Sequence, residues 1–255
     1  MNNDLVRLGL HVGSLVSSAI TANGMGESRE LIFKQFAALV VPLGSSISLV
    51  RVLRADLEGL TAAADVVRKG GLICYPTETV YGLGCDPFDA SAVERSMRVK
   101  GARTKPMPLL VKDIEIAKRF AQVSDHATKL ARRFWPGPLT IVLPALGALP
   151  KILVPSGTVG LRSPKHAVCL SLLGLCSGAL VGTSANLTGH SPAVSADQVV
   201  RELGDRVDLV LDGGTTPLGV ASTVVDLTKP NLTILREGPI GKPEIMRCLR
   251  EMAPR

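Results

Sequence analysis

The sequence contains few aromatic residues. Phe, Trp and Tyr make up 3% of its 255 residues, so the core is expected to be aliphatic. RNA recognition by base stacking is disfavoured for the same reason, because it needs exposed rings. The five cysteines form no C-x-x-C pair, and their odd number and apolar neighbours indicate buried thiols in a reducing compartment. Cysteine usage therefore predicts a cytoplasmic protein.

Metal, membrane and common nucleotide-binding signatures are missing as well. The four histidines show no metal-ligand spacing. The chain has no G-x-x-x-x-G-K-[ST] loop and no G-x-S-x-G turn, and its GLGCDP segment lacks the third glycine of a dinucleotide-binding loop. No uninterrupted apolar run has membrane-spanning length, and Asp4 with the lack of a basic start disfavours a signal peptide. Any bound nucleotide must therefore be held by dispersed side chains.

A regular alternation of apolar runs and amphipathic segments is present from Leu49 onward. Residues 1–48 are interpreted as a weakly specified extension with a short helix near 30–40, and residues 49–255 as the main domain. The net charge of +7 favours an anionic partner, either a phosphate-bearing small molecule or nucleic acid.

The alternation predicts an α/β fold in which a mixed sheet is flanked by helices. The first expected helix is capped by Asp56 and ends before Gly70. The other expected helices cover residues 90–99, 113–121, 125–134, 164–173, 195–203 and 243–252. The expected strands cover residues 72–75, 108–111, 139–143, 158–162, 179–183, 209–212, 222–227 and 232–236.

Polar side chains follow several of these strands, where ligand sites of α/β sheets usually lie. Thr77, Glu78 and Thr79 come directly after the strand LICY, and they could either contact a ligand or form a solvated turn capped by hydroxyl groups. Lys100 and Arg103 lie at the end of a basic helix, where they could bind an anion or belong to a plain charged surface.

Two further strand ends carry groups suited to anions. Arg162 ends the strand TVGLR, and its guanidinium could bind a carboxylate or phosphate in bidentate fashion or form a structural ion pair. The segment GTSAN, residues 182–186, could grip phosphate oxygens or cap the following turn. Trp135 in FWPGP is interpreted as a packing anchor beside a rigid turn.

Six segments occur in an order that resembles the YrdC-like threonylcarbamoyl-AMP synthases, in their single-domain form. The segments are YPTETVYGLG, KGAR followed by PL, FWPGPLTIVL, TVGLR, TSANLTG, and GVASTVVD followed by LREG, and the resemblance covers about residues 49–240. The resemblance implies a twisted mixed α/β sheet around a concave basic cleft. It also implies a nucleotidyltransferase that joins L-threonine, bicarbonate or CO2, and ATP into threonylcarbamoyl-AMP and pyrophosphate, for N6-threonylcarbamoyladenosine in tRNA.

The same resemblance assigns roles to individual residues. It implies that Thr79, Arg162 and Ser222 contact threonine, and that Lys100 and Arg103 act in catalysis by holding the ATP phosphates. It implies further nucleotide contacts for Thr158, Ser184, Asn186, Ser191 and Arg236. Mg²⁺ is expected to accompany ATP, and no residue is assigned to a metal. A tRNA threonylcarbamoyl-transferase complex is the expected recipient of the product, direct contact with tRNA is left open, and no membrane partner is expected.

The sequence departs from the family pattern at three places. The family spacing K-x-R is K-x-x-R here, from Lys100 to Arg103. Met107 replaces an asparagine before the PL dipeptide, and Lys112 falls near the position of a threonine-contacting histidine. These departures concern the details of ATP and threonine contact. The alternative from another class is a basic RNA-binding protein that uses the same concave surface without catalysis.

Overall fold

The computed structural model describes residues 50–101, 106–147 and 149–251. These residues belong to the second of the two units into which the chain divides, Ser48–Arg255. The helix expected near residues 30–40 lies outside the described residues.

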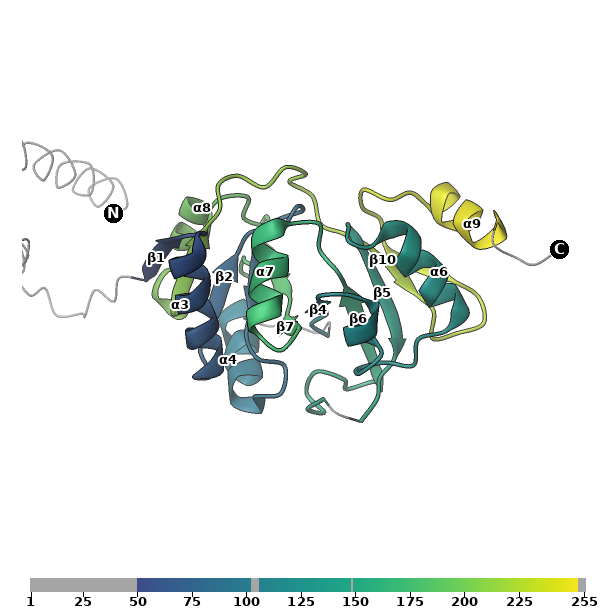
Figure 1. Cartoon of the computed structure of the whole chain (residues 1–255), viewed down its shortest axis with the longest axis horizontal. Coiled ribbons are helices and arrows are strands. Elements are labelled where there is room, and N and C mark those ends of the chain that lie inside the picture. Colours follow the sequence, from purple (N-terminus) through teal and green to yellow (C-terminus); the bar gives the residue numbers. More distant parts are fainter. Residues whose placement is uncertain (1–49, 102–105, 148, 252–255) are drawn as a thin grey trace, which may run out of the picture. The chain divides into compact units, whose positions relative to one another are not determined.

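The strands form two mixed sheets, where the sequence predicts one (Figure 1). In spatial order, the first contains β1 (Arg51–Arg54), β9 (Leu209–Asp212), β2 (Ile73–Tyr75), β3 (Gly82–Gly84) and β8 (Thr183–Ser184). The second contains β11 (Thr233–Arg236), β10 (Thr223–Asp226), β5 (Leu139–Pro144), β6 (Thr158–Arg162), β4 (Leu109–Val111) and β7 (Ala179–Val181). Both sheets combine parallel pairs, such as β2 with β9 and β4 with β6, with antiparallel ones. The α/β class with mixed sheets is therefore confirmed.

Five of the seven described α-helices begin where a short polar side chain caps them. Asp56, Asp89, Asp113, Ser124 and Ser195 each accept a hydrogen bond from the backbone N–H three residues later. The helices are α3 (Leu57–Arg68), α4 (Ala90–Lys100), α5 (Ile114–Ala117), α6 (Asp125–Phe134), α7 (Ala167–Leu175), α8 (Ala196–Leu203) and α9 (Lys242–Glu251).

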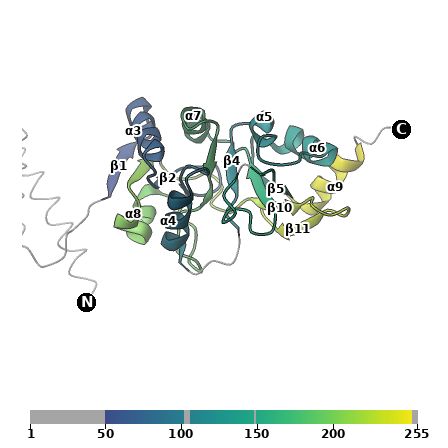
Figure 2. The same cartoon turned by 90° about the horizontal axis from the view of Figure 1, so that it is seen from below.

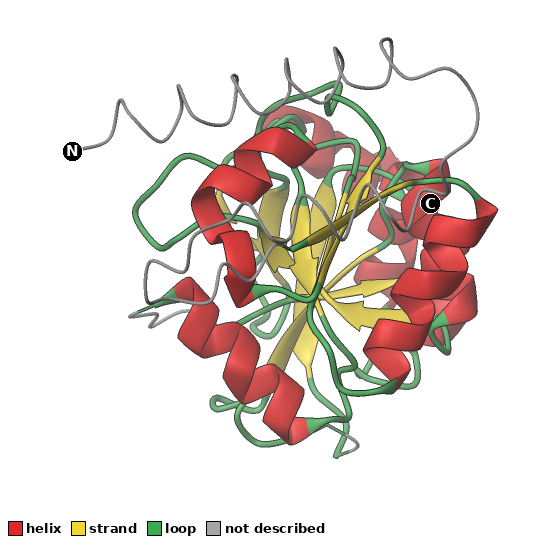
Figure 3. Cartoon of the chain, turned by 90° about the vertical axis from the view of Figure 1, so that its left-hand side faces the viewer, coloured by secondary structure: helices red, strands yellow, loops and turns green. Residues whose placement is uncertain are grey.

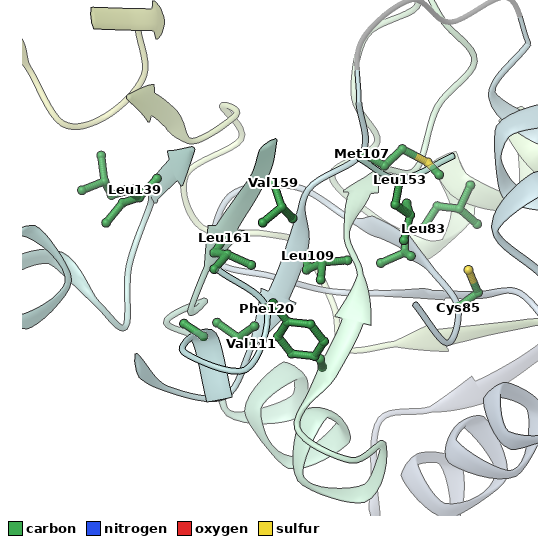
Figure 4. Packing of buried hydrophobic residues seen from close by; sticks show 14 of the residues in the cluster. Leu83, Cys85, Met107, Leu109, Val111, Phe120, Leu139, Leu153, Val159 and Leu161 are labelled. Carbon is green, nitrogen blue, oxygen red and sulfur yellow. The ribbon is translucent and has the colours of Figure 1, made fainter. Parts of the chain in front are cut away.

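Helices cover both faces of the strands, as Figure 3 shows. Figure 2 shows α3, α7, α5 and α6 along one side, with α4 and α8 on the other. Between α3, α7 and the strands lies one cluster of buried residues, which includes Leu60, Val67, Ile73, Leu172 and Leu209. A second and larger cluster is built mainly from aliphatic residues such as Leu83, Leu109 and Leu161 (Figure 4). The expected aliphatic core is confirmed.

The two sheets are joined at Gly182. The chain leaves the second sheet after β7 and enters the first at β8, and the Gly182 N–H donates to the Pro108 carbonyl at 2.8 Å. A Cβ atom at this glycine would lie 2.5 Å from Leu110 Cγ, so only glycine fits the crossing without a shift of its neighbours. The loop between β9 and β10, residues 213–222, is a second link between the sheets. The candidate site lies at this junction.

Candidate active site

A polar pocket of about 110 Å³ opens where the two sheets meet. Its walls include Thr77 and Thr79 after β2, Arg162 at the end of β6, Ser184 on β8, Ser222 just before β10, and Arg236 at the end of β11. Segments that lie far apart in the sequence therefore converge on one cavity. The structure brings together the three strand ends that the sequence marks by their polar residues, those at Thr77 and Thr79, at Arg162 and at Ser184.

The turn after β2 is held by its own hydroxyl groups. Thr77 Oγ1 donates to the Val80 carbonyl at 2.6 Å and accepts from the N–H groups of Thr79 and Val80 at 3.2 and 3.3 Å. It also lies 2.9 Å from Thr79 Oγ1. Thr77 and Thr79 are buried, so the alternative of a solvated turn is wrong, while its hydroxyl capping is confirmed.

Arg162 is both ion-paired and part of the pocket wall. Its Nη2 atom lies 2.8 Å from Glu78 Oε2, and both side chains are less than 10% exposed, at 8% and 7%. Its Nε donates to the Gly137 carbonyl at 3.1 Å. The structural ion pair that the sequence left open is thus present, and the same guanidinium still faces the cavity.

A second guanidinium lines the pocket opposite a pair of hydroxyl groups. Arg236 donates from Nε to the Ser222 carbonyl at 2.9 Å and from Nη2 to Ser222 Oγ at 3.1 Å. Ser222 Oγ also lies 2.8 Å from Thr140 Oγ1. Burial lowers the pKa of Arg236, and the positive charge of Arg162 lowers it further. The mutual effect of two cations in one cavity indicates a site that favours an anion.

Lys100 is buried against the segment after β8. Its Nζ donates to the Ser184 carbonyl at 2.7 Å and to Asn186 Oδ1 at 3.1 Å, and it also contacts the Asn186 carbonyl. The Asn186 amide in turn donates to the carbonyls of Leu187 and His190 at 2.7 and 2.8 Å. The alternative of a plain charged surface is therefore wrong for Lys100, which fixes the turn that carries Ser184. Arg103 lies outside the described residues.

A larger cavity of about 490 Å³ adjoins the polar pocket. The two share Pro108, Thr140 and Arg236, and the larger one is also lined by Thr158 and by the apolar side chains Val142, Val224 and Leu235. Ser191 instead lines a separate hollow with His190 and Glu202. The structure thus places Thr79, Arg162, Ser184, Ser222 and Arg236 together and Thr158 next to them, with Ser191 apart.

The sequence reasoning missed Thr140 as a wall of both cavities. Thr140 is a polar residue within the buried strand LTIVLP, and that interruption of an apolar run was the available signal. The departures at Met107 and Lys112 lie outside the pocket: Met107 is buried and accepts from the Ser96 hydroxyl at 3.5 Å, and Lys112 has an exposed side chain. Trp135 donates to the Leu139 carbonyl at 2.7 Å, in agreement with its expected role as an anchor.

The described residues contain no group of three or more His, Cys, Asp or Glu side chains placed to hold a metal ion. None of the helices in that part of the chain is both long and apolar enough to cross a membrane.

Comparison with known proteins identifies the family. The model of the family described as "Telomere recombination" (Sua5, YciO and YrdC) matches residues 65–238. A threonylcarbamoyl-AMP synthase of Pyrococcus abyssi is 37% identical over 196 residues, which are 74% of this chain and 57% of that protein. A putative threonylcarbamoyl-AMP synthase of Mycobacterium tuberculosis is 38% identical over 194 residues, 75% of this chain and 89% of that protein.

Solved structures agree with the sequence comparison. P. abyssi Sua5 complexed with L-threonine has a TM-score of 0.74 at 35% identity, over 78% of this chain and 60% of that chain. E. coli YciO has a TM-score of 0.69 at 28% identity, over 77% of this chain and 98% of that chain. The present chain therefore spans little more than half of the P. abyssi synthase but nearly the whole of YciO. On these grounds the chain belongs to the Sua5/YciO/YrdC family.

Proposed function

We propose that this protein is an L-threonylcarbamoyladenylate synthase, a nucleotidyltransferase that converts L-threonine, bicarbonate or CO2, and ATP into threonylcarbamoyl-AMP and pyrophosphate. The observation that carries the proposal is a small polar pocket with two arginines that shares a wall with a larger, partly apolar cavity. One cavity suits an amino acid and the other a nucleotide. We assign the activity to residues 49–255.

The small pocket is the proposed threonine site. Arg162 pairs with the threonine carboxylate, because hydrogen bonds between a charged guanidinium and a carboxylate are strong. Thr79 and Ser222, both buried in the pocket wall, contact the rest of the amino acid. This assignment is supported by the relative from P. abyssi, whose structure was solved in complex with L-threonine.

The larger cavity is the proposed nucleotide site. Its apolar side chains offer a surface for a base, while Thr158 and Arg236 offer polar contacts. Arg236 lines both cavities, so it can reach a phosphate that lies between them. Ser184, Asn186 and Ser191 lie outside this cavity, with Ser184 in the small pocket and Ser191 in a separate hollow, and they are proposed as further nucleotide contacts, with Lys100 acting through the turn that it holds. Arg103 is proposed to bind the phosphates directly. Mg²⁺ enters as the complex with ATP, held mainly by the phosphate oxygens.

The reaction proceeds in two steps. The neutral amine of threonine attacks CO2 to form the N–C bond of a carbamate, and the amine proton is released. A carbamate oxygen then attacks the α-phosphorus, and the bond to pyrophosphate breaks. Arg236 and Arg103 stabilise the charge that grows on the phosphate oxygens and on the leaving group. The enclosed pocket holds the short-lived carbamate beside the phosphorus and limits its exposure to water.

The product would be passed to a tRNA threonylcarbamoyl-transferase complex for N6-threonylcarbamoyladenosine formation. We place the enzyme in the cytoplasm, a location supported by five cysteines that are all buried. The second candidate function, RNA binding without catalysis, is less well supported. An RNA surface needs cations along an open track, whereas Arg162 and Lys100 are buried and Arg236 lines the small pocket.

The proposal is tested by pyrophosphate release from the purified protein with ATP, Mg²⁺ and bicarbonate, with and without L-threonine. Reactions with L-serine and without bicarbonate run in parallel. Release that requires both threonine and bicarbonate is expected. A folded protein that binds RNA with a steep salt dependence but releases no pyrophosphate would instead support the second candidate.

A further inference from the structure

Glu78 carries a buried carboxylate that the proposed reaction leaves unexplained. Glu78 and Arg162 are 6% and 7% exposed as whole residues. Their ion pair is close, at 2.8 Å, but both Glu78 oxygens and Arg162 Nη2 are buried without a hydrogen bond of good geometry among the described residues. Buried polar atoms are nearly always hydrogen-bonded, so a pair left in this state calls for an explanation.

The contacts of Arg162 fall on one edge of its guanidinium. Nε donates to the Gly137 carbonyl at 3.1 Å, and Nη2 lies 2.8 Å from Glu78 Oε2. Nε and Nη2 form the side edge of the group, one of the two edges at which a guanidinium makes paired contacts. With the side edge occupied and Nη2 buried, Nη1 is the guanidinium nitrogen that remains for a ligand in the pocket that Arg162 lines.

We propose that Glu78 is a positioning residue that holds the side edge of Arg162 and thereby directs Nη1 of the guanidinium toward the substrate carboxylate. This inference rests on the proposed function of Arg162. Glu78 itself is not among the residues that line the pocket, whereas its neighbours Thr77 and Thr79 are. Glu78 therefore acts through Arg162 and not on the amino acid.

Arg162 is the cation that pairs with the negative charge of Glu78. The pKa values of His166 and Cys169 also respond to the charge of Glu78, and His166 has a buried atom, Nδ1, without a hydrogen bond in the described region. Burial lowers the pKa of His166 more than the charge of Glu78 raises it, so the imidazole is neutral near pH 7. A neutral imidazole does not compete with Arg162 for the carboxylate.

A backbone hydrogen bond also connects Glu78 to the loop that ends at Ser222, a residue of the pocket wall. The Glu78 carbonyl accepts from the Leu218 N–H at 3.0 Å, and Leu218 belongs to the 213–222 loop that ends at Ser222. A buried ion pair is often no more stabilising than apolar side chains of similar size. Orientation of a binding group is therefore a better account of this pair than stability.

The test compares Glu78→Gln with the unchanged protein in steady-state kinetics and in calorimetric titration with L-threonine. Glutamine keeps the shape but removes the charge, so Arg162 should lose its fixed direction. We expect the KM for threonine and the Kd for threonine to rise about 10- to 100-fold, with the KM for ATP changed less than about twofold. Equal threonine KM and Kd values in both proteins would overturn the inference.

Asp208→Asn is the matched control, because Asp208 forms an ion pair with Arg95, at 2.6 Å, away from both cavities. Removal of that pair should lower stability and leave both KM values unchanged. If Asp208→Asn raised the threonine KM as much as Glu78→Gln, the effect would come from lost stability and the inference would fail. Glu78→Asp retains the charge at a shorter reach and should give an intermediate rise; it replaces Glu78→Gln if the latter does not fold.

A double-mutant cycle with Arg162→Lys separates positioning from direct contact. Because Glu78 acts only through the guanidinium, Glu78→Gln should change the threonine Kd less than about twofold when Arg162 is already lysine. Full additivity would overturn the inference. Titration needs no turnover, so a protein that binds threonine without pyrophosphate release would refute the proposed function and still decide the role of Glu78. Absence of threonine binding in the unchanged protein would refute both.

Discussion

Ser222 joins the two proposed substrate sites through a single hydroxyl group. Its Oγ lies 2.8 Å from Thr140 Oγ1 and 3.1 Å from Arg236 Nη2. Ser222→Ala should raise the KM for threonine and lower the free energy of unfolding by about 1–3 kcal/mol, because the buried Thr140 hydroxyl and the partly buried Arg236 contact lose a partner. Urea unfolding and steady-state kinetics measure the two effects. An unchanged threonine KM would remove Ser222 from the proposed site.

Substitutions of Arg162 and of Arg103 should each raise the KM for a different substrate. Arg162→Ala should raise the threonine requirement far more than the ATP requirement, because it removes the proposed carboxylate partner. Arg103→Ala should do the reverse, because it removes a proposed phosphate contact. The KM for each substrate at saturating concentration of the other checks this prediction. If both variants kept the kinetics of the unchanged protein, the site assignment would be wrong.

The sequence predicts single residues of the site, but not the contacts between them. Arg162 ends an apolar strand, so its position alone marks it, whereas Ser222 was assigned only through the family resemblance. The ion pair between Glu78 and Arg162 could not be predicted from the sequence, because the two residues are 84 positions apart and meet only in the folded protein. The contact of Lys100 with the turn at Asn186 could not be predicted for the same reason, because the two residues are also far apart in the sequence.

Strand β3 shows what an element of the site requires of its sequence. A Cβ atom at Gly84 would lie 2.5 Å from the Val181 carbonyl and 2.7 Å from Tyr75 Cε1. Gly84→Ala should therefore destabilise the protein by about 1–3 kcal/mol through overpacking. Gly174 in helix α7 is the matched control: it is exposed and a Cβ there meets no atom within 4 Å.

Gly174→Ala should stabilise the protein by about 0.5–1 kcal/mol, because alanine has the higher helix propensity. Chemical denaturation of both variants gives the comparison. Similar changes in the free energy of unfolding for the two variants would show that the close packing of β3 against Tyr75 is unimportant.

Elements with strong local patterns were predicted well. The helix expected at residues 125–134 has the bounds of α6, and α3 begins after the expected Asp56 cap. The helix expected at 113–121 is only the single turn of α5, and the one expected at 164–173 begins at Ala167. Strands β1 and β3 were missed, because they are short and their sequences, RVLR and GLG, lack a strong strand pattern, and the strand expected at 179–183 is divided between β7 and β8.

At the scale of the whole molecule, the division into two sheets decides where the site lies. Sequential apolar strands predict a sheet, but strand partners depend on contacts between distant segments, such as Leu109 with Val181. The crossing at Gly182 and the loop 213–222 bring the ends of both sheets together. Residues that look unrelated in the sequence thereby line one pocket, which is why the site was recognised from its motifs before its geometry could be derived.

The buried thiols should make the free energy of unfolding of the whole protein depend on pH. Burial raises the pKa of Cys176 to about 11 and that of Cys85 to about 12, and it also raises the pKa values of Cys74 and Cys169. In the unfolded chain these thiols lose their protons above pH of about 9. Above that pH the unfolded chain binds fewer protons than the folded protein, so the free energy of unfolding should fall.

The loss should begin near pH 9, the ordinary thiol pKa, and continue until the pH passes the raised values of about 11 and 12. Within this range each thiol contributes a decrease of about 1.4 kcal/mol per pH unit. Urea unfolding at several pH values between about 8 and 11, with a reductant present, measures the slope. Cys176→Ala is the control, because removal of one titrating thiol should make the slope shallower by one proton. A free energy of unfolding that stays constant over this range would mean that the thiols titrate alike in the folded and unfolded states, and that the core is open to water.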